Sequence, residues 1–460
     1  MDIQQVERVV DKMAEAGLSR RKFLELAGMG TGALALGPLL AACGNTPGGT
    51  AAQVKELKAP TTNVEVAYWN PFSGPDGNFM KRLVDQFNSE TPTVKVTTTT
   101  IGNPPYYTKL QAAAVSGTLP DVAIIHNDAI PYNAANNVLS PVDDLVSLLG
   151  LTGDDFTPEV WTHTQYKGKR YGIPLDTHTE SFYWNKDLFT KAGLDPSKPP
   201  TDKASFTEAA KAITQKAGVP GFMVVGSGGG GAFLAGVEWA SFFYQGGGKW
   251  TDDGYSKATF NSDAGVNAAT FMRELITSGA AKGPVESDSE VAAFKQGKNG
   301  MVMSGIWETT GYQAALGDKL GAGPVPRIFG TGVWSGSHTL CVTTRKGSAD
   351  QRQAAYYFVN WISKHSLEWA KAGQIPARKS VRNGAGFKAI PYVSDIAVQA
   401  PDARFFPPII SPADMLFGDN GAGQAITQIV SGKKDAKTAL DASAAFYTQI
   451  IQQNKSKYGF

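Results

Sequence analysis

The chain contains 460 residues, of which 42% are hydrophobic, so it is long enough to bury a large core and to form two or three domains. Its 43 basic residues nearly balance its 41 acidic residues, and the net charge of +2 gives no indication of a nucleic acid or another polyanion as a partner. The first 42 residues hold five basic and five acidic residues, so their removal would leave this balance unchanged.

The N-terminal segment has the features of a targeting sequence. Arg20 and Arg21 stand directly before a moderately apolar stretch of 17 residues, 24–40, which is shorter than the roughly 20 residues that cross a bilayer. The paired arginines and this stretch resemble a twin-arginine export signal. The sequence Leu-Ala-Ala-Cys-Gly that ends at Gly44 resembles the lipobox of bacterial lipoproteins. Together the two motifs predict a signal peptide over residues 1–42.

The lipoprotein resemblance implies that Cys43 becomes the first mature residue and carries a diacylglyceryl group, which anchors the protein to the cell membrane on its extracytoplasmic side. Residues 43–60 are small and polar and predict a flexible tether. Once Cys43 is acylated, Cys341 is the remaining thiol, so no disulfide can form within the chain. Because Cys341 lies in an apolar stretch, we expect it to be a small core residue.

Short apolar strands alternate with amphipathic helices after the tether, which is the pattern of an α/β fold. The expected strands are 64–69, 94–100 and 122–125, and the expected helices are 78–89 and 106–116. Residues 122–125 are apolar without interruption, as a strand buried on both faces would be. The polar residues His126, Asn127 and Asp128 follow directly, and in open parallel sheets ligands bind at this end of the strands.

A second α/β unit follows the first. Ser205 and Glu208 have the spacing of a capping box, which would open a helix that ends at Gly218. Further strands are expected over 182–184, 222–225, 301–304 and 340–344, with further helices over 263–278 and 289–296. Another strand is expected to end at Pro174, so the residues from Asp176 to Glu180 are expected to form a loop.

Several short segments, each weak by itself, occur in a specific order along the mature chain. They are Tyr68-Trp69-Asn70 with Gly74-Pro75-Asp76-Gly77, Gly117-Thr118-Leu119-Pro120-Asp121-Val122, Tyr171-Gly172-Ile173-Pro174, Tyr183-Trp184-Asn185-Lys186-Asp187-Leu188, Phe294-Lys295-Gln296-Gly297-Lys298 and Gly336-Ser337-His338. As a set they resemble the extracellular solute-binding proteins of carbohydrate ABC importers, the maltose-binding-like group.

This resemblance implies a periplasmic-binding-protein-like α/β fold. Two lobes, each with a central sheet flanked by helices, would be joined by a hinge that the chain crosses three times. We place the crossings near Asp176, Val333 and Gly373. The N-terminal lobe would then comprise residues 61–176 and 333–373, and the C-terminal lobe residues 177–332 and 374–460.

Binding a sugar requires flat apolar faces for its C–H groups and fixed polar groups for its hydroxyls. Residues of both kinds occur near predicted strand ends and turns. The candidate ligand-binding residues are Trp69, Asn70, Asn127, Asp128, Asp176, His178, Glu180, Trp239, Trp307, Trp334, Ser337, His338 and Arg378. Glycines flank Trp307 and Trp334, which leaves little apolar surface near them and favours a position in the cleft over one in the core.

Other chemistries remain as alternatives. Asp176 and Glu180 are close enough in sequence to be the carboxyl pair of a secreted glycoside hydrolase. Arg378 would suit a phosphorylated polyol such as glycerol 3-phosphate, or the hydroxyls of a neutral sugar. Residues 226–231 match the dinucleotide pattern G-x-G-x-x-G, but we interpret this glycine run as a loop at the rim of the cleft. The five histidines lack metal-ligand spacing, so no metal is predicted, although a calcium site stays open.

The sequence therefore predicts a binding protein and not an enzyme. It would capture a carbohydrate between its lobes, act as a monomer without a cofactor, and deliver the sugar to the permease subunits of an ABC importer.

Overall fold

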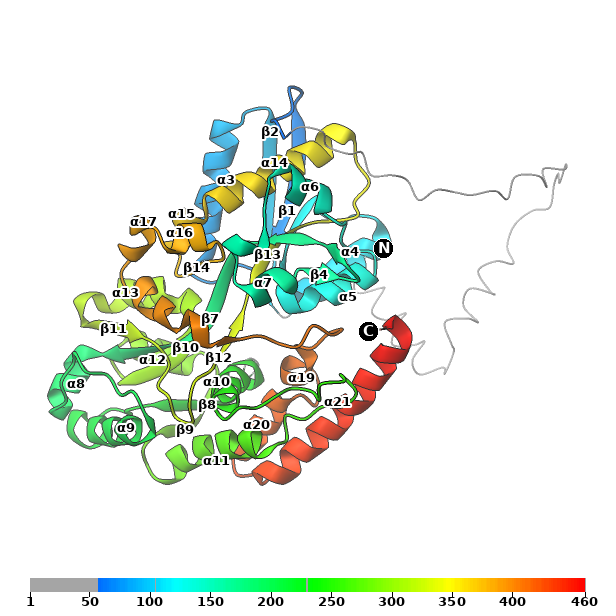
Figure 1. Ribbon diagram of the computed structural model, residues 1–460. Coiled ribbons are helices and arrows are strands. Elements are labelled where there is room, and N and C mark those ends of the chain that lie inside the picture. Colours follow the sequence, from blue (N-terminus) through cyan, green and yellow to red (C-terminus); the bar gives the residue numbers. More distant parts are fainter. Residues whose placement is uncertain (1–56, 104, 229–230, 460) are drawn as a thin grey trace, which may run out of the picture. The chain divides into compact units, whose positions relative to one another are not determined.

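The computed structural model describes residues 57–103, 105–228 and 231–459. The predicted signal peptide, Cys43 and most of the predicted tether lie outside these residues. Within the described ranges, no helix combines the length and the apolar character needed to cross a membrane. The described chain folds around two separate sheets, which we call the N-terminal and the C-terminal lobe (Figure 1).

The sheet of the N-terminal lobe has five strands in the order β2-β1-β3-β13-β6. These are β1 (Val64–Asn70), β2 (Val94–Thr100), β3 (Val122–His126), β6 (Gly172–Pro174) and β13 (His338–Val342). Strand β1 runs parallel to β2 and β3, whereas β13 runs antiparallel to β3 and β6.

Helices cover both faces of this sheet, which explains the uninterrupted apolar run in β3. Val122 and Ile124 pack in one core cluster with α3 (Gly77–Glu90) and α14 (Ala349–Lys364). Ala123 and Ile125 point to the opposite face and pack with α4 (Pro105–Ser116). Cys341 is fully buried in this second cluster and forms no disulfide, so the prediction that it is a core residue is confirmed.

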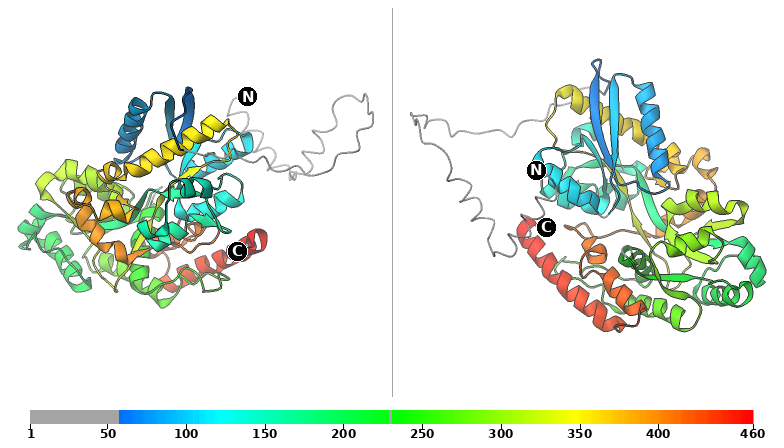
Figure 2. Two further views of the ribbon diagram at one scale, coloured as in Figure 1. Left: turned by 45° about the horizontal axis from the view of Figure 1, so that its top comes forward. Right: turned by 180° about the vertical axis from the view of Figure 1, so that it is seen from behind.

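The sheet of the C-terminal lobe is built around one long strand, β7 (Asp176–Asn185). The strand order is β10-β7-β12-β15, and β11 and β14 also pair with β7. These neighbours are β10 (Met301–Gly305), β11 (Leu320–Gly323), β12 (Val333–Gly336), β14 (Ile375–Pro376) and β15 (Ala403–Arg404). The apolar helix α10 (Gly231–Gln245) lies in the core of this lobe, and the long α21 (Ala436–Tyr458) packs along its outer side (Figure 2).

The chain passes between the two sheets at three places. It leaves β6 at Pro174 and enters β7 at Asp176, and it returns at Ser337, between β12 and β13. The third passage follows α15 (Ser366–Ala370), whose Trp369 packs in the N-terminal core, and leads into β14, which pairs with β7. The sequence analysis placed the second passage near Val333, and in the structure it lies four residues later, at Ser337.

Most expected elements occur within two residues of their predicted bounds, but three local expectations are wrong. Helix α9 (Lys203–Ala217) begins two residues earlier than predicted, because the capping box pairs the Asp202 side chain with Ser205 and not Ser205 with Glu208. Residues 176–180 form the first half of β7 and not a loop. Trp239 lies within helix α10 and not at a turn.

Trp239 is therefore a core residue. Its indole is fully buried, stacks on Phe243 with ring centroids 4.9 Å apart, and donates a hydrogen bond to the Gly265 carbonyl at 2.9 Å. A side chain enclosed in this way cannot contact a ligand in the cleft, which corrects its assignment as a candidate binding residue. The misplacement arose because α10 is apolar on all sides, and such a helix lacks the one-sided pattern that reveals an amphipathic helix.

Trp239→Ala is expected to lower the free energy of unfolding by about 3–5 kcal/mol, because it leaves a large cavity in the C-terminal core. Urea unfolding followed by circular dichroism measures this loss. Trp307→Ala is the matched control, since Trp307 is only half-buried and should cost less. Equal stability of wild type and Trp239→Ala would contradict the placement of Trp239 in the core.

Candidate ligand site at the lobe crossing

Strand β7 carries three of the predicted site residues on one face. Asp176, His178 and Glu180 alternate with Thr177 and Thr179, and side chains two residues apart in a strand point to the same side. All three are at most 3% exposed. The strand runs from the crossing into the C-terminal lobe, so the three side chains meet three different environments.

Asp176, at the start of β7, is held by two donor residues of the N-terminal lobe. It accepts hydrogen bonds from the backbone N–H of His338 at 3.0 Å, from Nδ1 of His338 at 2.9 Å and from the indole Nε1 of Trp369 at 2.7 Å. Burial alone would raise the pKa of Asp176, but His338 and His178 outweigh it and hold that pKa well below its ordinary value. Asp176 is therefore an ionised structural group, and its oxygens are already occupied.

Three histidines converge beside Asp176. His126 and His338 are direct partners in the antiparallel pairing of β3 with β13, so they share one face of the N-terminal sheet. His178 comes from the other sheet, and its ring centroid lies 4.3 Å from that of His338. Each ring offers one nitrogen within 4.8 Å of the other two. Burial, followed by the neighbouring histidines, lowers the pKa of His178 to about 4 and that of His126 well below its ordinary value, so both are neutral at pH 7.

Glu180 lies deeper, inside the C-terminal lobe. It accepts a short hydrogen bond from Ser241 and borders a cavity of about 10 Å³, room for about one water molecule. Glu238 and Glu290 border the same cavity, and each has one buried carboxyl oxygen without a protein partner. Burial raises the pKa of Glu180 to about 8, so this carboxyl is largely protonated at neutral pH.

The two glycine-flanked tryptophans lie beside His178. Trp307 is half-buried, and its ring centroid is 6.1 Å from that of His178. A Cβ on Gly305 would come within 2.1 Å of the Trp307 ring, so only glycine allows the indole to fold back over the end of β10. Trp334 is 4% exposed and packs in the core cluster of the C-terminal lobe, so the expectation that it lies in the cleft is wrong. Its ring centroid is 5.8 Å from that of His178, and its indole Nε1 is buried without a hydrogen-bond partner.

Several other predicted residues have structural partners. The Asn70 side chain accepts from the Phe72 backbone and from Thr100, and therefore fixes the turn after β1. The Asn127 side-chain oxygen accepts from the backbone N–H of Ser337 at 3.0 Å, which ties the end of β3 to the second crossing. Trp69 is half-buried against the cluster that contains α4.

Arg378 follows β14, two residues beyond Pro376. Its guanidinium donates to Ser363 Oγ and lies 3.8 Å from Asp155, so it is already engaged and does not line a described groove.

Asp128 faces the opposite lobe. This half-buried side chain follows β3, and burial together with the charge of Asp414 in the C-terminal lobe raises its pKa to about 7. Close by, Asn127 contacts the ring of His163 at 3.3 Å, and that ring packs on Phe405 with centroids 6.0 Å apart. The N-terminal lobe therefore meets the segment after β15 through side chains that a solute could also contact.

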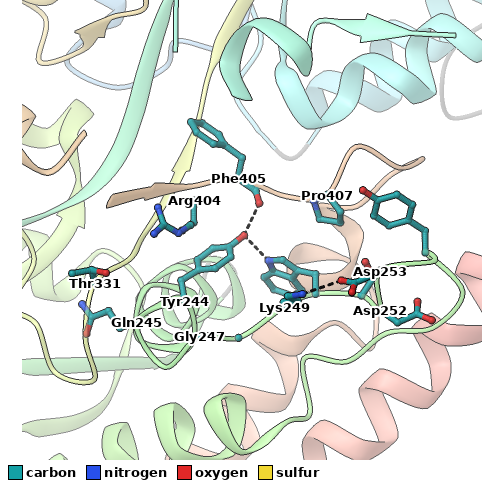
Figure 3. A pocket seen from close by; sticks show the side chains of 14 residues that line it. Tyr244, Gln245, Gly247, Lys249, Asp252, Asp253, Thr331, Arg404, Phe405 and Pro407 are labelled. Atoms are coloured by element: carbon teal, nitrogen blue, oxygen red, sulfur yellow. Dashed lines mark hydrogen bonds and ion pairs between the residues drawn. The ribbon is translucent and has the colours of Figure 1, made fainter. Parts of the chain in front are cut away.

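A groove of about 810 Å³ lies in the C-terminal lobe next to this contact (Figure 3). Its aromatic lining comprises Tyr244, Trp250, Tyr255 and Phe405, and its charged lining comprises Lys249, Asp252, Asp253 and Arg404. The Tyr244 hydroxyl donates to the Phe405 carbonyl and accepts from the Trp250 indole, which fixes the aromatic wall. The sequence analysis missed these residues, although three glycines precede Lys249 and Trp250, the same signal that it used for Trp307.

A family model described as bacterial extracellular solute-binding protein matches residues 82–394, more than half of the chain. The chain belongs to this family. Its description is that of extracellular binding proteins, which agrees with the binding function and the extracytoplasmic location that the sequence analysis predicted.

Individual proteins resemble this solute-binding protein to different extents. It is 31% identical over 163 residues to the sn-glycerol-3-phosphate-binding periplasmic protein UgpB of Escherichia coli K12. That match covers 33% of the chain and 37% of the relative, so the chain spans little more than a third of the length of the curated relatives it matches.

Two solved structures share the fold. The GacH receptor of Streptomyces glaucescens, solved unliganded and with acarbose and an acarbose homologue, is 25% identical with a TM-score of 0.75, covering 85% of this chain and 100% of that one. UgpB of Mycobacterium tuberculosis, solved with glycerophosphocholine, is 20% identical with a TM-score of 0.72, covering 85% and 99%.

The buried Glu180 should make the stability of this solute-binding protein depend on pH. Its pKa is about 8 in the folded protein against an ordinary value of 4.5, so the unfolded chain releases this proton more readily. Stability is therefore lost as pH rises from about 4.5 to about 8, by at most about 1.4 kcal/mol per pH unit. Glu180→Gln keeps an acceptor for Ser241 but removes the titrating group. The difference in free energy of unfolding between Glu180→Gln and wild type should therefore shift in favour of the variant as the pH rises through this range.

Urea unfolding at pH 5, 7 and 9 tests this expectation. Glu208→Gln is the control, because Glu208 is exposed on α9 and its replacement should leave the pH dependence of wild type unchanged. Parallel pH profiles for wild type and Glu180→Gln would mean that Glu180 is ionised in the folded state.

Proposed function

We propose that this protein captures a carbohydrate between its two lobes and delivers it to the membrane permease of an ABC importer. The observation that carries the proposal is the groove beside the lobe contact, whose volume falls within the 300–1,000 Å³ of typical small-molecule sites. Aromatic rings and hydrogen-bonding groups line it together, and a sugar needs both. The sequence identity to GacH, which was solved with acarbose, supports the same ligand class.

Two sets of residues would hold the sugar. Tyr255 and Phe405 would contact the sugar in the groove. Trp307 does not line this groove, but it is half-buried at the end of β10 beside His178 and would stack on a ring face there. On the N-terminal side, Asp128 would accept a hydroxyl hydrogen bond when the lobes meet.

Lobe closure would couple binding to transport. Each lobe has its own core, and the three crossings are short, so the lobes can rotate about the crossings without unfolding. A sugar that contacts both lobes adds free energy only to the closed form and therefore shifts the population towards it. The permease would recognise this closed form, and the transporter would supply the ATP chemistry.

A phosphorylated polyol is the second candidate, favoured by the partial match to the glycerol-3-phosphate-binding protein of Escherichia coli. In the groove, Arg404 donates to the carbonyls of Pro401 and Ala403 and has no carboxylate partner in the described part of the chain. Lys249, however, is paired with Asp253 at 2.9 Å. One available guanidinium among several acids fits hydroxyl groups better than a phosphate, which calls for several converging cations or N–H groups.

Hydrolysis is not part of the proposal. A glycosidase needs two carboxyl groups that face one substrate bond. Asp176 is saturated by donors at the crossing, and Glu180 is enclosed inside the C-terminal lobe. The proposal also includes export as a lipoprotein, anchorage through Cys43 and action as a monomer.

A thermal-shift screen against neutral mono- and oligosaccharides, acarbose and sn-glycerol 3-phosphate tests the ligand class. A sugar present at 100 times its Kd should stabilise the protein by about 2.7 kcal/mol, while the phosphate should not. For the best sugar, Trp307→Ala and Tyr255→Ala should each weaken binding by about 1–3 kcal/mol in calorimetry, because stacked apolar area is lost.

Trp361→Ala is the control for that experiment. Trp361 lies on α14 in the N-terminal core, so its loss should lower the melting temperature while the sugar affinity of the folded protein persists. Stabilisation by sn-glycerol 3-phosphate alone would replace the sugar proposal with the second candidate.

The anchor has a separate test. Cys43→Ala should move the protein from the membrane fraction to the soluble fraction, because residue 43 then lacks the thiol that accepts the lipid. Arg20→Lys combined with Arg21→Lys should retain the protein in the cytoplasm. Cys341→Ala is the matched control, since the Cys341 thiol is buried and should not affect fractionation. Unchanged membrane association of Cys43→Ala would refute the lipoprotein assignment.

A further inference from the structure

We propose that His126, His178 and His338 form a binding site for one divalent transition-metal ion, with Zn²⁺ as the reference ion. The three rings converge at the lobe crossing, and each offers one nitrogen within 4.8 Å of the other two. The spacing of these residues in the sequence shows no metal motif, because they lie on three strands and meet only in the folded protein. This inference is independent of the proposed sugar.

The available nitrogens follow from the hydrogen bonds that the rings already make. Nδ1 of His126 is bonded to the Tyr107 hydroxyl at 2.6 Å, and Nδ1 of His338 is bonded to Asp176 at 2.9 Å. Both rings therefore have Nε2 left for a ligand. This arrangement, in which a second group fixes one nitrogen while the other binds, is the usual support of a metal-binding histidine.

A buried nitrogen of His178 is a second, independent observation that points to a ligand at this site. The His178 side chain is 3% exposed, yet Nδ1 has no hydrogen-bond partner, and Asp176 Oδ1 lies 3.6 Å away, beyond hydrogen-bonding distance. A buried nitrogen without a partner costs free energy that a bound ion, or a shift of the ring on binding, would recover. Gly336 lies opposite His178, and any Cβ there would clash with the ring at 2.3 Å, so the backbone leaves space for it.

The ligand chemistry limits the identity of the ion. Imidazole nitrogens suit Zn²⁺, Cu²⁺, Ni²⁺ and Fe²⁺, whereas Ca²⁺ and Mg²⁺ require oxygen ligands. Three histidines around Zn²⁺ also leave a fourth position for water or for a solute oxygen. Because Zn–N distances are 2.0–2.1 Å, tetrahedral ligand nitrogens lie roughly 3.4 Å apart, so the rings would have to draw together by about an ångström.

Such a movement would act on the hinge. His126 and His338 belong to the sheet of the N-terminal lobe, while His178 belongs to the sheet of the C-terminal lobe. An ion bound to all three would add a link between the lobes beside Asp176. The affinity for the metal ion would therefore depend on the relative position of the two sheets, and a bound ion would favour the position that brings the three rings together.

Competition with a chromophoric zinc chelator tests the site on the purified full-length protein after removal of bound metal. Wild type should bind one equivalent of Zn²⁺. His178→Ala and His338→Ala should each weaken binding by at least about 100-fold, beyond the 10–100-fold that outer substitutions cost. Tyr107→Phe, which removes only the support of His126, should weaken it about 10-fold. Co²⁺ should give the visible absorption of a four-coordinate complex in wild type and lose it in His338→Ala.

The controls separate this site from adventitious binding. His365→Ala should leave the affinity unchanged, because His365 stacks on Trp361 with ring centroids 3.6 Å apart, away from the cluster. Cys43→Ser excludes binding by that thiol. Where His178→Ala fails to fold by circular dichroism, His126→Gln replaces it, since His126 is only half-buried. Absence of one-equivalent binding, or wild-type affinity in the folded histidine variants, would overturn the proposal, and neither result bears on sugar binding.

Discussion

The structure depends on a buried carboxylate at the point where the chain passes between its lobes. Asp176 ends the first passage, His338 ends the second, and Trp369 precedes the third. His338 and Trp369 both donate hydrogen bonds to Asp176. A buried charge is costly unless several donors compensate it, so these bonds must form together. One side chain therefore fixes the meeting of three segments that are distant in the sequence.

The alternation of β7 extends this arrangement into the site. Asp176, His178 and Glu180 share one face, but their surroundings differ. Hydrogen bonds keep Asp176 ionised, burial among rings keeps His178 neutral, and enclosure inside the lobe keeps Glu180 largely protonated. The same strand thus carries a structural anion at the crossing, a buried neutral imidazole beside it and a neutral acid inside the C-terminal lobe. The environment of each residue, and not its chemical type, decides its role.

Two kinds of recognition surface lie near this strand. The groove beside Phe405 combines aromatic rings with polar groups, a combination suited to neutral hydroxylated solutes. The histidine cluster offers nitrogen ligands and little open surface, and it lies between the sheets. Gly336 leaves space for the His178 ring of this cluster, and Gly305 leaves space for the neighbouring Trp307 ring, since a Cβ at either position would clash with that ring. Burial, together with the charge of Asp414 in the C-terminal lobe, raises the pKa of Asp128 at the end of β3.

The sequence by itself determined the α/β class, the family resemblance and most strands and helices, because these depend on local periodicity and ordered motifs. It placed the polar group after β3 correctly, since an uninterrupted apolar strand followed by His126, Asn127 and Asp128 has one physical interpretation. Trp239 was misassigned because a uniformly apolar helix conceals which residues are core. Only the tertiary structure decided that residues 176–180 continue a strand, that Asp176 serves the hinge, and that three histidines meet. Those properties depend on pairings between segments more than 150 residues apart, such as Asp176 with His338, and no local pattern encodes them.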